Sequence, residues 1–215
     1  LQENVSAAND LKINEAINTA ITQKGPVHIN APFEEPLYET VSALSVAANT
    51  VAFANNTQTI SIEEVSEYAT IWNNATKKMI LVGVNEPNAI SKKTITAFAK
   101  EESVVVLTET TSNVHHETFI NTIDTIITPF TKEDFEYFRP EILVTFGGMV
   151  VSKRIKTFLR KYKPKHHWHI DPWRAYDTFG ALTKHFEVTP NVFFDAFLPL
   201  TNATESNYFQ QFNAV

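Results

Sequence analysis

Two glycines and two cations lie close together in the chain and could bind an anionic ligand. Gly147 and Gly148 directly follow the apolar run 142–146, and Lys153 and Arg154 come soon after them. In open α/β sheets, ligands bind beyond the carboxyl ends of strands, at helix N-termini. Cations in the first turn of a helix oppose its dipole, at a cost of about 0.3–1 kcal/mol each, and a nearby anion would explain them.

The composition leaves a second interpretation of these cations equally open, namely that the helix is simply basic. Most of the later cations are well placed toward its C-terminus, where the helix dipole favours positive charge. They are Lys156, Arg160, Lys161, Lys163 and Lys165.

A second polar loop, residues 109–113, follows the apolar run 104–107. Parallel strands end at the same edge of a sheet, so Ser112 could contact a ligand from this side. An ordinary strand-to-helix connection with Ser112 as a cap explains the loop as well, and the residues favour this interpretation.

Three histidines surround a tryptophan at residues 166–169. Side chains alternate between the two faces of a strand, so His167 and His169 share one face and His166 lies on the other. At most two of the three imidazoles would therefore converge on a metal. Polar positions on a strand near the sheet edge, with Trp168 in the core, are the favoured interpretation.

Composition excludes several classes of protein. The chain of 215 residues has no cysteine, which excludes disulfides and thiolate zinc sites and suits a reducing cytoplasm. Its formal charge of −6 argues against general nucleic-acid binding. We find no apolar run long enough to span a membrane, and only 5 glycines, too few for most glycine-rich phosphate loops.

Apolar runs alternate with amphipathic segments and predict an α/β fold. Buried runs at 79–84, 104–107 and 142–146, a further strand at 124–127, and shorter strands at 168–171 and 186–188 read as parallel strands. Helices are expected between them. We therefore predict a three-layer domain with a mostly parallel sheet of about six strands and helices on both faces.

The prolines and irregular composition around residues 31–60 indicate a domain boundary. Before it, a helix from Asn9, ended by Gly25 in the left-handed position, leads to a short strand at 27–30. We assign residues 1–38 to the end of a first domain and 39–59 to a linker. Residues 60–200 form the α/β domain, and 201–215 begin a further linker.

Residues 25–38 read GPVHINAPFEEPLY. This segment resembles the GPVHxNxPFxEPLY stretch of the MenD family, the thiamine-diphosphate enzymes of menaquinone biosynthesis. The sequence from Arg139 to Gly148, followed by Ser152, Lys153 and Arg154, is similar to the family's PDxxxxxG…[SG]KR element. Residues 166–171 are similar to the strand that follows it.

The resemblance implies a middle region of a longer enzyme. The parent would decarboxylate 2-oxoglutarate on thiamine diphosphate and add the product to isochorismate, as a cytoplasmic homo-oligomer. The glutamate that activates the cofactor and the magnesium-binding GDG motif would lie outside this chain. We therefore expect no catalytic residue, cofactor or metal within it, and no activity of the piece alone. The family's Lys-Arg pair for substrate carboxylates maps onto Lys153 and Arg154, and Gly148 stands where the family often has serine.

Two other classes of function stay open. One is a nucleotide-binding module that holds FAD or NAD, which would need a glycine-rich turn after the first strand. The turn at 85–88 reads NEPN and contains no glycine. The other is an interaction domain that holds an oligomer together.

Overall fold

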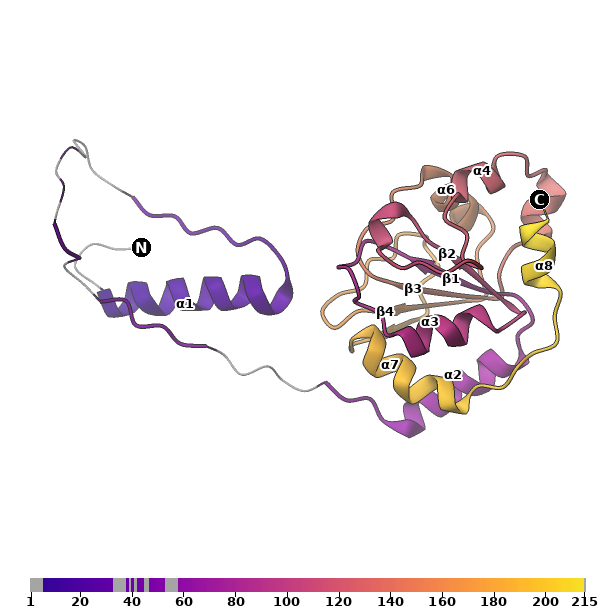
Figure 1. The fold of residues 1–215 in the computed structure, drawn as a ribbon, viewed down its shortest axis with the longest axis horizontal. Helices are drawn as coiled ribbons and strands as arrows, with labels where there is room; N and C mark the ends of the chain where they lie inside the picture. The colour runs from indigo at the N-terminus through magenta and orange to yellow at the C-terminus, as the bar shows by residue number, and fades with distance from the viewer. Residues whose placement is uncertain are drawn as a thin grey trace. The chain divides into compact units, whose positions relative to one another are not determined.

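The computed structural model describes residues 6–32, 38, 40, 42–44, 47–52 and 58–214. The chain divides into two compact units, residues 1–57 and 58–215. The helix and the following segment that the sequence assigned to a first domain, with most of the expected linker, belong to the first unit, and the α/β domain belongs to the second (Figure 1).

The first unit contains the helix α1 (Ser6–Gln23), with no buried residue. The helix ends with Lys24 in the left-handed conformation (φ 48°), so the prediction that Gly25 takes this position is wrong. The predicted strand at 27–30 is absent, because these residues have no strand partner among the described residues. The amides of Asn14 and Asn18 instead bind the backbone at residues 49–51, with Asn14 Oδ1 accepting from Val51 N at 2.7 Å.

A five-stranded sheet, parallel throughout, forms the centre of the second unit. Its order is β2-β1-β3-β4-β5. The strands are β1 (Lys78–Val82), β2 (Val104–Leu107), β3 (Ile142–Phe146), β4 (His166–Ile170) and β5 (Lys184–Phe186). Every residue of β1, β2 and β3 is buried, as expected for strands covered on both faces.

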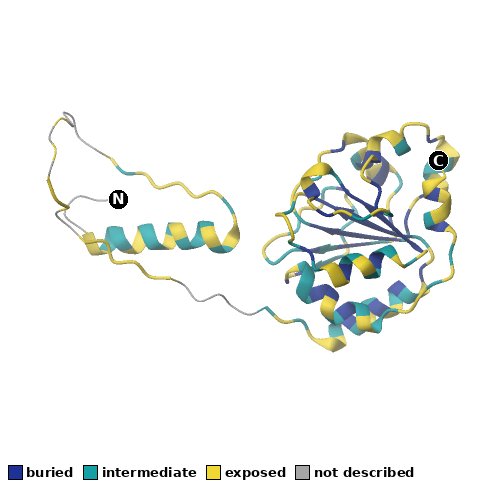
Figure 2. Cartoon of the chain, viewed as in Figure 1, coloured by how far each residue is buried: buried dark blue, intermediate teal, exposed yellow. Residues whose placement is uncertain are grey.

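Helices cover both faces of this sheet (Figure 1). One face packs against α2 (Ile62–Asn74), α3 (Lys92–Ala99) and α7 (Pro190–Phe197). The other packs against α4 (Ile123–Ile127), α5 (Lys132–Tyr137), α6 (Lys153–Lys161) and α8 (Tyr208–Asn213). Two short 3₁₀ turns are η1 (Thr110–Ser112) and η2 (Leu198–Leu200). The strands are buried and the helices are exposed on their outer sides (Figure 2). The predicted three-layer α/β architecture is therefore confirmed.

Two details of the sheet differ from the prediction. Residues 124–127 do not form a strand but belong to the helix α4, because Ile123 and Ile127, four residues apart, are both buried on one helical face. The sheet has five strands and not six. Among the described residues, one isolated parallel bridge, between Leu107 and Ile120, extends the sheet beyond β2.

The segment after residue 200 is part of the second unit's core, although the sequence suggested the start of a linker. Tyr208 and Phe212 of α8 are almost completely buried in the second hydrophobic cluster. The Tyr208 hydroxyl donates to the carbonyl of Phe138 at 2.8 Å. Among the described residues, no helix has the length and apolar character needed to cross a membrane.

A buried lysine joins this last segment to the sheet. Lys78, at the start of β1, is fully buried, and its Nζ lies 2.9 Å from both Ser103 Oγ and Thr204 Oγ1. Glu101 Oε1 is 4.0 Å away. Burial lowers the pKa of Lys78 to about 8, against the opposing effect of the Glu101 charge.

Because the unfolded chain binds this proton more tightly, stability should rise with pH above 8. Between about pH 7.5 and about pH 9.5 we expect the free energy of unfolding to increase by about 2 kcal/mol. Urea unfolding at the two pH values measures it. Lys78→Met should abolish the increase, whereas an unchanged increase in this variant would assign it to another group. The measurements should stay below pH 10. Burial raises the pKa of Tyr208, so above pH 10 the unfolded chain loses this tyrosine proton while the folded chain keeps it, and stability then decreases with pH.

Candidate functional site

The crevice between the loops that follow β1 and β3 is filled by backbone. These strands are neighbours on either side of the point where the strand order reverses, which is where open α/β sheets bind nucleotides. Gly148 N donates to Val84 O at 2.7 Å, and Gly83 N donates to Phe146 O at 2.9 Å. A Cβ at Gly83 would lie 2.0 Å from the Gly148 carbonyl oxygen. The two glycines therefore allow the loops to touch each other, and they leave no room for a diphosphate between them.

Gly147 has a positive φ of 79°, and a Cβ there would meet Asn85 Nδ2 at 2.5 Å. Glycine at this position therefore allows the left-handed turn and lets the backbone lie against the Asn85 side chain. Both glycines of the predicted site therefore shape the loop, and a ligand contact by either one stays a prediction.

The N-terminus of α6 is occupied by a carboxylate of the chain itself. Glu109 Oε2 accepts from Val151 N at 2.8 Å, and Oε1 accepts from Ser152 N at 2.6 Å. Ser152 is the N-cap of α6, with its Oγ accepting from Ile155 N and donating to Asp124 Oδ1. Two negative charges thus lie at the positive end of this helix, where the dipole stabilises them.

Ser112 acts inside the protein. It is fully buried, its Oγ donates to Val82 O at 2.7 Å, and the same oxygen accepts from Glu109 N at 2.9 Å. Ser112 therefore fixes Glu109 to the end of β1. The structure gives it the capping role that the residues favoured, and its side chain has no exposed surface for a ligand.

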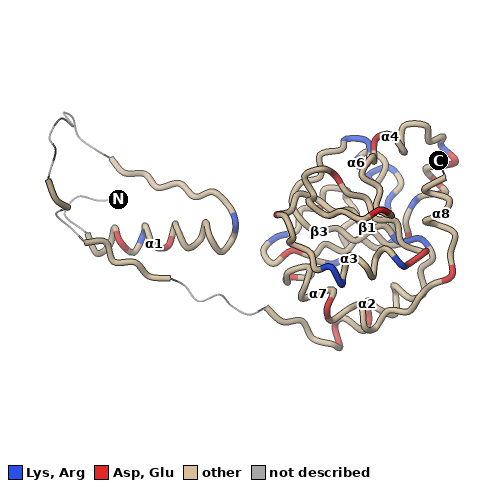
Figure 3. Tube along the Cα trace, viewed as in Figure 1, with Lys and Arg blue, Asp and Glu red and all other residues tan. Residues whose placement is uncertain are grey.

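Lys153 and Arg154 lie in the first turn of α6, as predicted, and both are exposed. They line a cavity of about 400 Å³ between α4, α5 and α6, together with Lys161. Its walls are apolar and aromatic, formed by Ile127, Phe130, Phe135, Phe158 and Tyr162. Figure 3 marks the lysines and arginines along α6 in blue.

No carboxylate lines this cavity, and neither Lys153 nor Arg154 forms an ion pair within the part of the chain that the structure describes. Arg160, in contrast, has a structural partner, because its Nε donates to Thr178 O at 2.8 Å. The cavity thus combines cations at the rim with an aromatic floor, an arrangement suited to an organic anion.

The three histidines of β4 are used in packing. Thr145 Oγ1 lies 2.9 Å from His167 Nε2 and 2.8 Å from His169 Nδ1, so one hydroxyl bridges two imidazoles. His166 points to the opposite face, with its ring 6.5 Å from that of Trp168. Burial lowers the pKa of His167 to about 4 and also lowers the pKa of His169. Within the described residues, no group of three His, Cys, Asp or Glu side chains could hold a metal ion.

The family described as "Middle domain of thiamine pyrophosphate" matches residues 48–206. The chain belongs to this family of thiamine pyrophosphate middle domains. The match covers the five-stranded sheet, the helices from α2 to α7 and most of the segment that leads to α8.

Similar curated proteins carry one name, 2-succinyl-5-enolpyruvyl-6-hydroxy-3-cyclohexene-1-carboxylate synthase. The protein of Flavobacterium johnsoniae is 58% identical over 100% of this chain and 39% of its own length. That of Flavobacterium psychrophilum is 60% identical over 97% of the chain and 38% of its own length. That of Christiangramia forsetii is 50% identical over 82% of the chain. These matches confirm the resemblance to the MenD family, and the middle-domain chain spans less than half the length of these relatives.

The cap formed by Glu109 makes a specific prediction about the stability of this middle domain. Glu109→Ala removes a charged acceptor from two backbone N–H groups, and we expect a loss of about 2 kcal/mol in the free energy of unfolding. Amide exchange at Val151 and Ser152 should accelerate in the same variant. Glu102→Ala, which removes an exposed carboxylate outside this network, is the control. Equal effects of the two substitutions would show that Glu109 is not a cap.

The pKa of His167 predicts sensitivity of the middle domain to acid. The unfolded chain binds a proton on this side chain below about pH 6.5 and the folded chain only near pH 4, so stability falls as the pH decreases through this window. Between about pH 7 and about pH 4.5 we expect the His167 contribution to cost about 2 kcal/mol of unfolding free energy. The His167→Gln variant should lose about 2 kcal/mol less stability over this pH range than the parent. The His115→Gln variant, which changes an exposed histidine, should lose as much stability as the parent. A His167→Gln variant as acid-sensitive as the parent would contradict the assignment.

Proposed function

We propose that this chain is the middle part of a 2-succinyl-5-enolpyruvyl-6-hydroxy-3-cyclohexene-1-carboxylate synthase that depends on thiamine diphosphate. The observation that carries the proposal is the identity of 58–60% with proteins of that name over nearly the whole chain. The parent would be a transferase of menaquinone biosynthesis in the cytoplasm. It would decarboxylate 2-oxoglutarate and add the resulting carbon fragment to isochorismate, as a homo-oligomer.

The described residues do not fit the cofactor itself. The strand-end crevice is filled by the Gly83–Gly148 contact, and the described part of the chain has no metal-ligand cluster. Thiamine diphosphate and Mg²⁺ would therefore be held by other regions of the parent, and this piece alone would be inactive. The filled crevice also argues against the alternative of an FAD or NAD module at that position.

In this proposal the middle part contributes cations to the substrate side. Arg154 offers a planar pair of N–H donors to a carboxylate, and Lys153 adds a second positive charge. Both proposed substrates are dicarboxylates, and the basic cavity provides apolar walls for their carbon skeletons. Glu109 and Asp124, which bind the end of α6, leave these two cations without an internal ion pair.

The test uses Arg154→Ala in the full-length parent. Loss of a charge-assisted hydrogen bond should lower kcat/KM for at least one carboxylate substrate by roughly ten- to hundred-fold. The stability of the fold should change little, because the substitution removes an exposed cation from the first turn of a helix, where the dipole does not favour positive charge.

The matched control is Arg139→Ala. Arg139 is exposed and precedes β3, so it lies at the amino ends of the strands, whereas Arg154 follows their carboxyl ends. Arg160 is less suitable, because it binds the Thr178 carbonyl. Steady-state kinetics with each substrate varied in turn measures both variants. Equally small effects of the Arg154 and Arg139 substitutions would mean that α6 is merely basic.

A further inference from the structure

Exposed apolar side chains gather at one edge of the sheet in the second unit. Five large ones, each between 42% and 73% exposed, lie in loops that follow strands. Val84 follows β1, Met149 and Val151 follow β3, and Trp173 and Tyr176 follow β4. These three strands are parallel neighbours, so their carboxyl ends lie side by side. The five residues therefore occupy one edge of the sheet, which we call the apolar edge.

The loops that carry these side chains have a fixed backbone. Val151 N donates to the Glu109 carboxylate at 2.8 Å. In the loop after β4, Asp171 Oδ1 accepts from Trp173 N at 2.8 Å and from Arg174 N at 2.9 Å. Clustered apolar side chains that a fixed backbone holds in solvent mark an interaction site.

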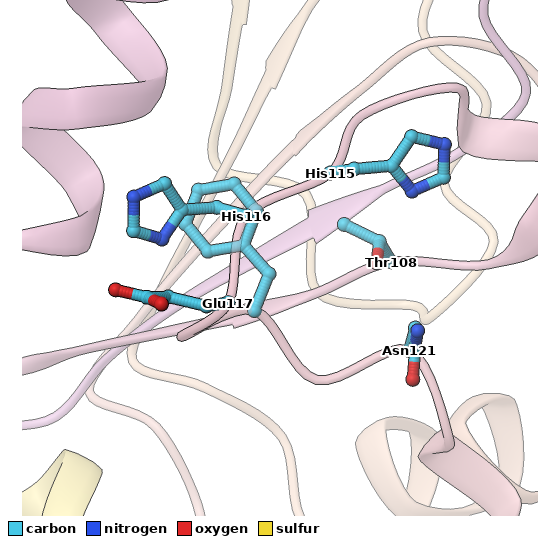
Figure 4. A pocket seen from close by; sticks show the side chains of 6 residues that line it. Thr108, His115, His116, Glu117 and Asn121 are labelled. Atoms are coloured by element: carbon cyan, nitrogen blue, oxygen red, sulfur yellow. The ribbon is translucent and has the colours of Figure 1, made fainter.

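Polar residues border the apolar edge. The next loop along the sheet, which follows the outer strand β2, presents His115, His116, Glu117 and Asn121 around a cavity of about 270 Å³ (Figure 4). Arg174 is exposed in the loop after β4. An apolar centre with a polar rim is the usual composition of a protein–protein interface, and tryptophan and tyrosine are its commonest anchors.

The opposite edge, at the amino ends of the strands, has a different character. The exposed residues Glu102, Arg139 and Lys165 precede β2, β3 and β4. Tyr137, at the end of α5, is an exposed aromatic residue on this side. Within the described part of the second unit, the row of exposed apolar side chains therefore belongs to the carboxyl ends.

The identity of the partner follows from the proposed function, on which this inference rests. Lys153 and Arg154 begin α6 shortly after Met149 and Val151, so a substrate carboxylate bound by them lies next to the apolar edge. A carbon–carbon bond forms only when the cofactor reaches the bound substrate. The described residues do not fit the cofactor, and this chain spans only 39% of the length of a close relative, so the longer parent has further chain that can cover this edge.

We propose that the apolar edge is the surface on which the cofactor-holding region of the parent docks. Trp173, Tyr176 and Met149 are the anchors, and they become buried when that region is present. Val84 and Val151 complete the apolar centre. The contact brings the cofactor to the same edge as Lys153 and Arg154 without requiring this chain to hold it.

Hydroxyl-radical labelling followed by mass spectrometry tests the surface. Met149, Trp173 and Tyr176 should be labelled at least about fivefold more slowly in the full-length parent than in the 215-residue chain, because the centre of an interface excludes water. Tyr137, at the amino ends of the strands, is the internal control and should be labelled at the same rate in both. Equal labelling of the three anchors in both proteins would overturn the proposal. Protection already present in the 215-residue chain that increases with its concentration would assign the edge to a second copy, and would overturn it too.

A photo-crosslinker identifies the partner. With p-benzoyl-phenylalanine in place of Trp173, the parent should cross-link to a peptide outside residues 1–215 whose own labelling decreases when thiamine diphosphate and Mg²⁺ bind. The same group in place of Tyr137 should not cross-link to that peptide. Cross-links from position 173 only to residues 1–215, or only to peptides that the cofactor leaves unchanged, would contradict the docking.

Neither measurement depends on turnover, so the two proposals can fail separately. Normal kinetics of Arg154→Ala with a protected edge would overturn the substrate contact alone. An unprotected edge with the expected kinetic loss in Arg154→Ala would overturn the docking alone.

Discussion

The bonds from the Glu109 carboxylate to Val151 N and Ser152 N connect two loops that lie more than forty residues apart in the chain. Glu109 is itself held by Ser112, which is anchored to the carbonyl of Val82 at the end of β1. The ends of three neighbouring strands are thus tied together by one buried hydroxyl and one carboxylate. The position of α6, and hence the direction of the cations in its first turn, follows from this link.

The same link explains the electrostatics of the basic cavity. Two cations at the start of a helix are unfavourable by themselves, and a nearby anion was expected to offset them. The protein supplies that anion from within, through Glu109 on the backbone N–H groups and Asp124 on the N-cap Ser152. Because these carboxylates bind N–H and O–H groups, Lys153 and Arg154 keep their own donors for an external ligand. The two cations in the first turn of α6 therefore do not by themselves require a ligand. The argument for a bound substrate now depends on the basic cavity and on the similarity to known proteins.

Local sequence was sufficient for most of the fold and for part of the site. The continuous apolar runs of β1, β2 and β3 identified strands buried on both faces, and Lys153 and Arg154 lie in the first turn of a helix, as the sequence predicted. Apolar spacing was ambiguous at 123–127, where Ile123 and Ile127 are compatible with a strand or with one helical turn. The role of Glu109 could not be predicted, because a carboxylate that caps a helix far along the chain leaves no local pattern.

The central claim is that Lys153 and Arg154 bind a substrate carboxylate in the full-length parent. A crystal structure of that protein with 2-oxoglutarate or isochorismate bound tests it most directly. The account predicts a substrate carboxylate paired with the Arg154 guanidinium at about 2.7–2.9 Å, with Glu109 still on the N-terminus of α6. A structure in which all substrate carboxylates are held by other regions, while Lys153 and Arg154 extend into solvent, would contradict it.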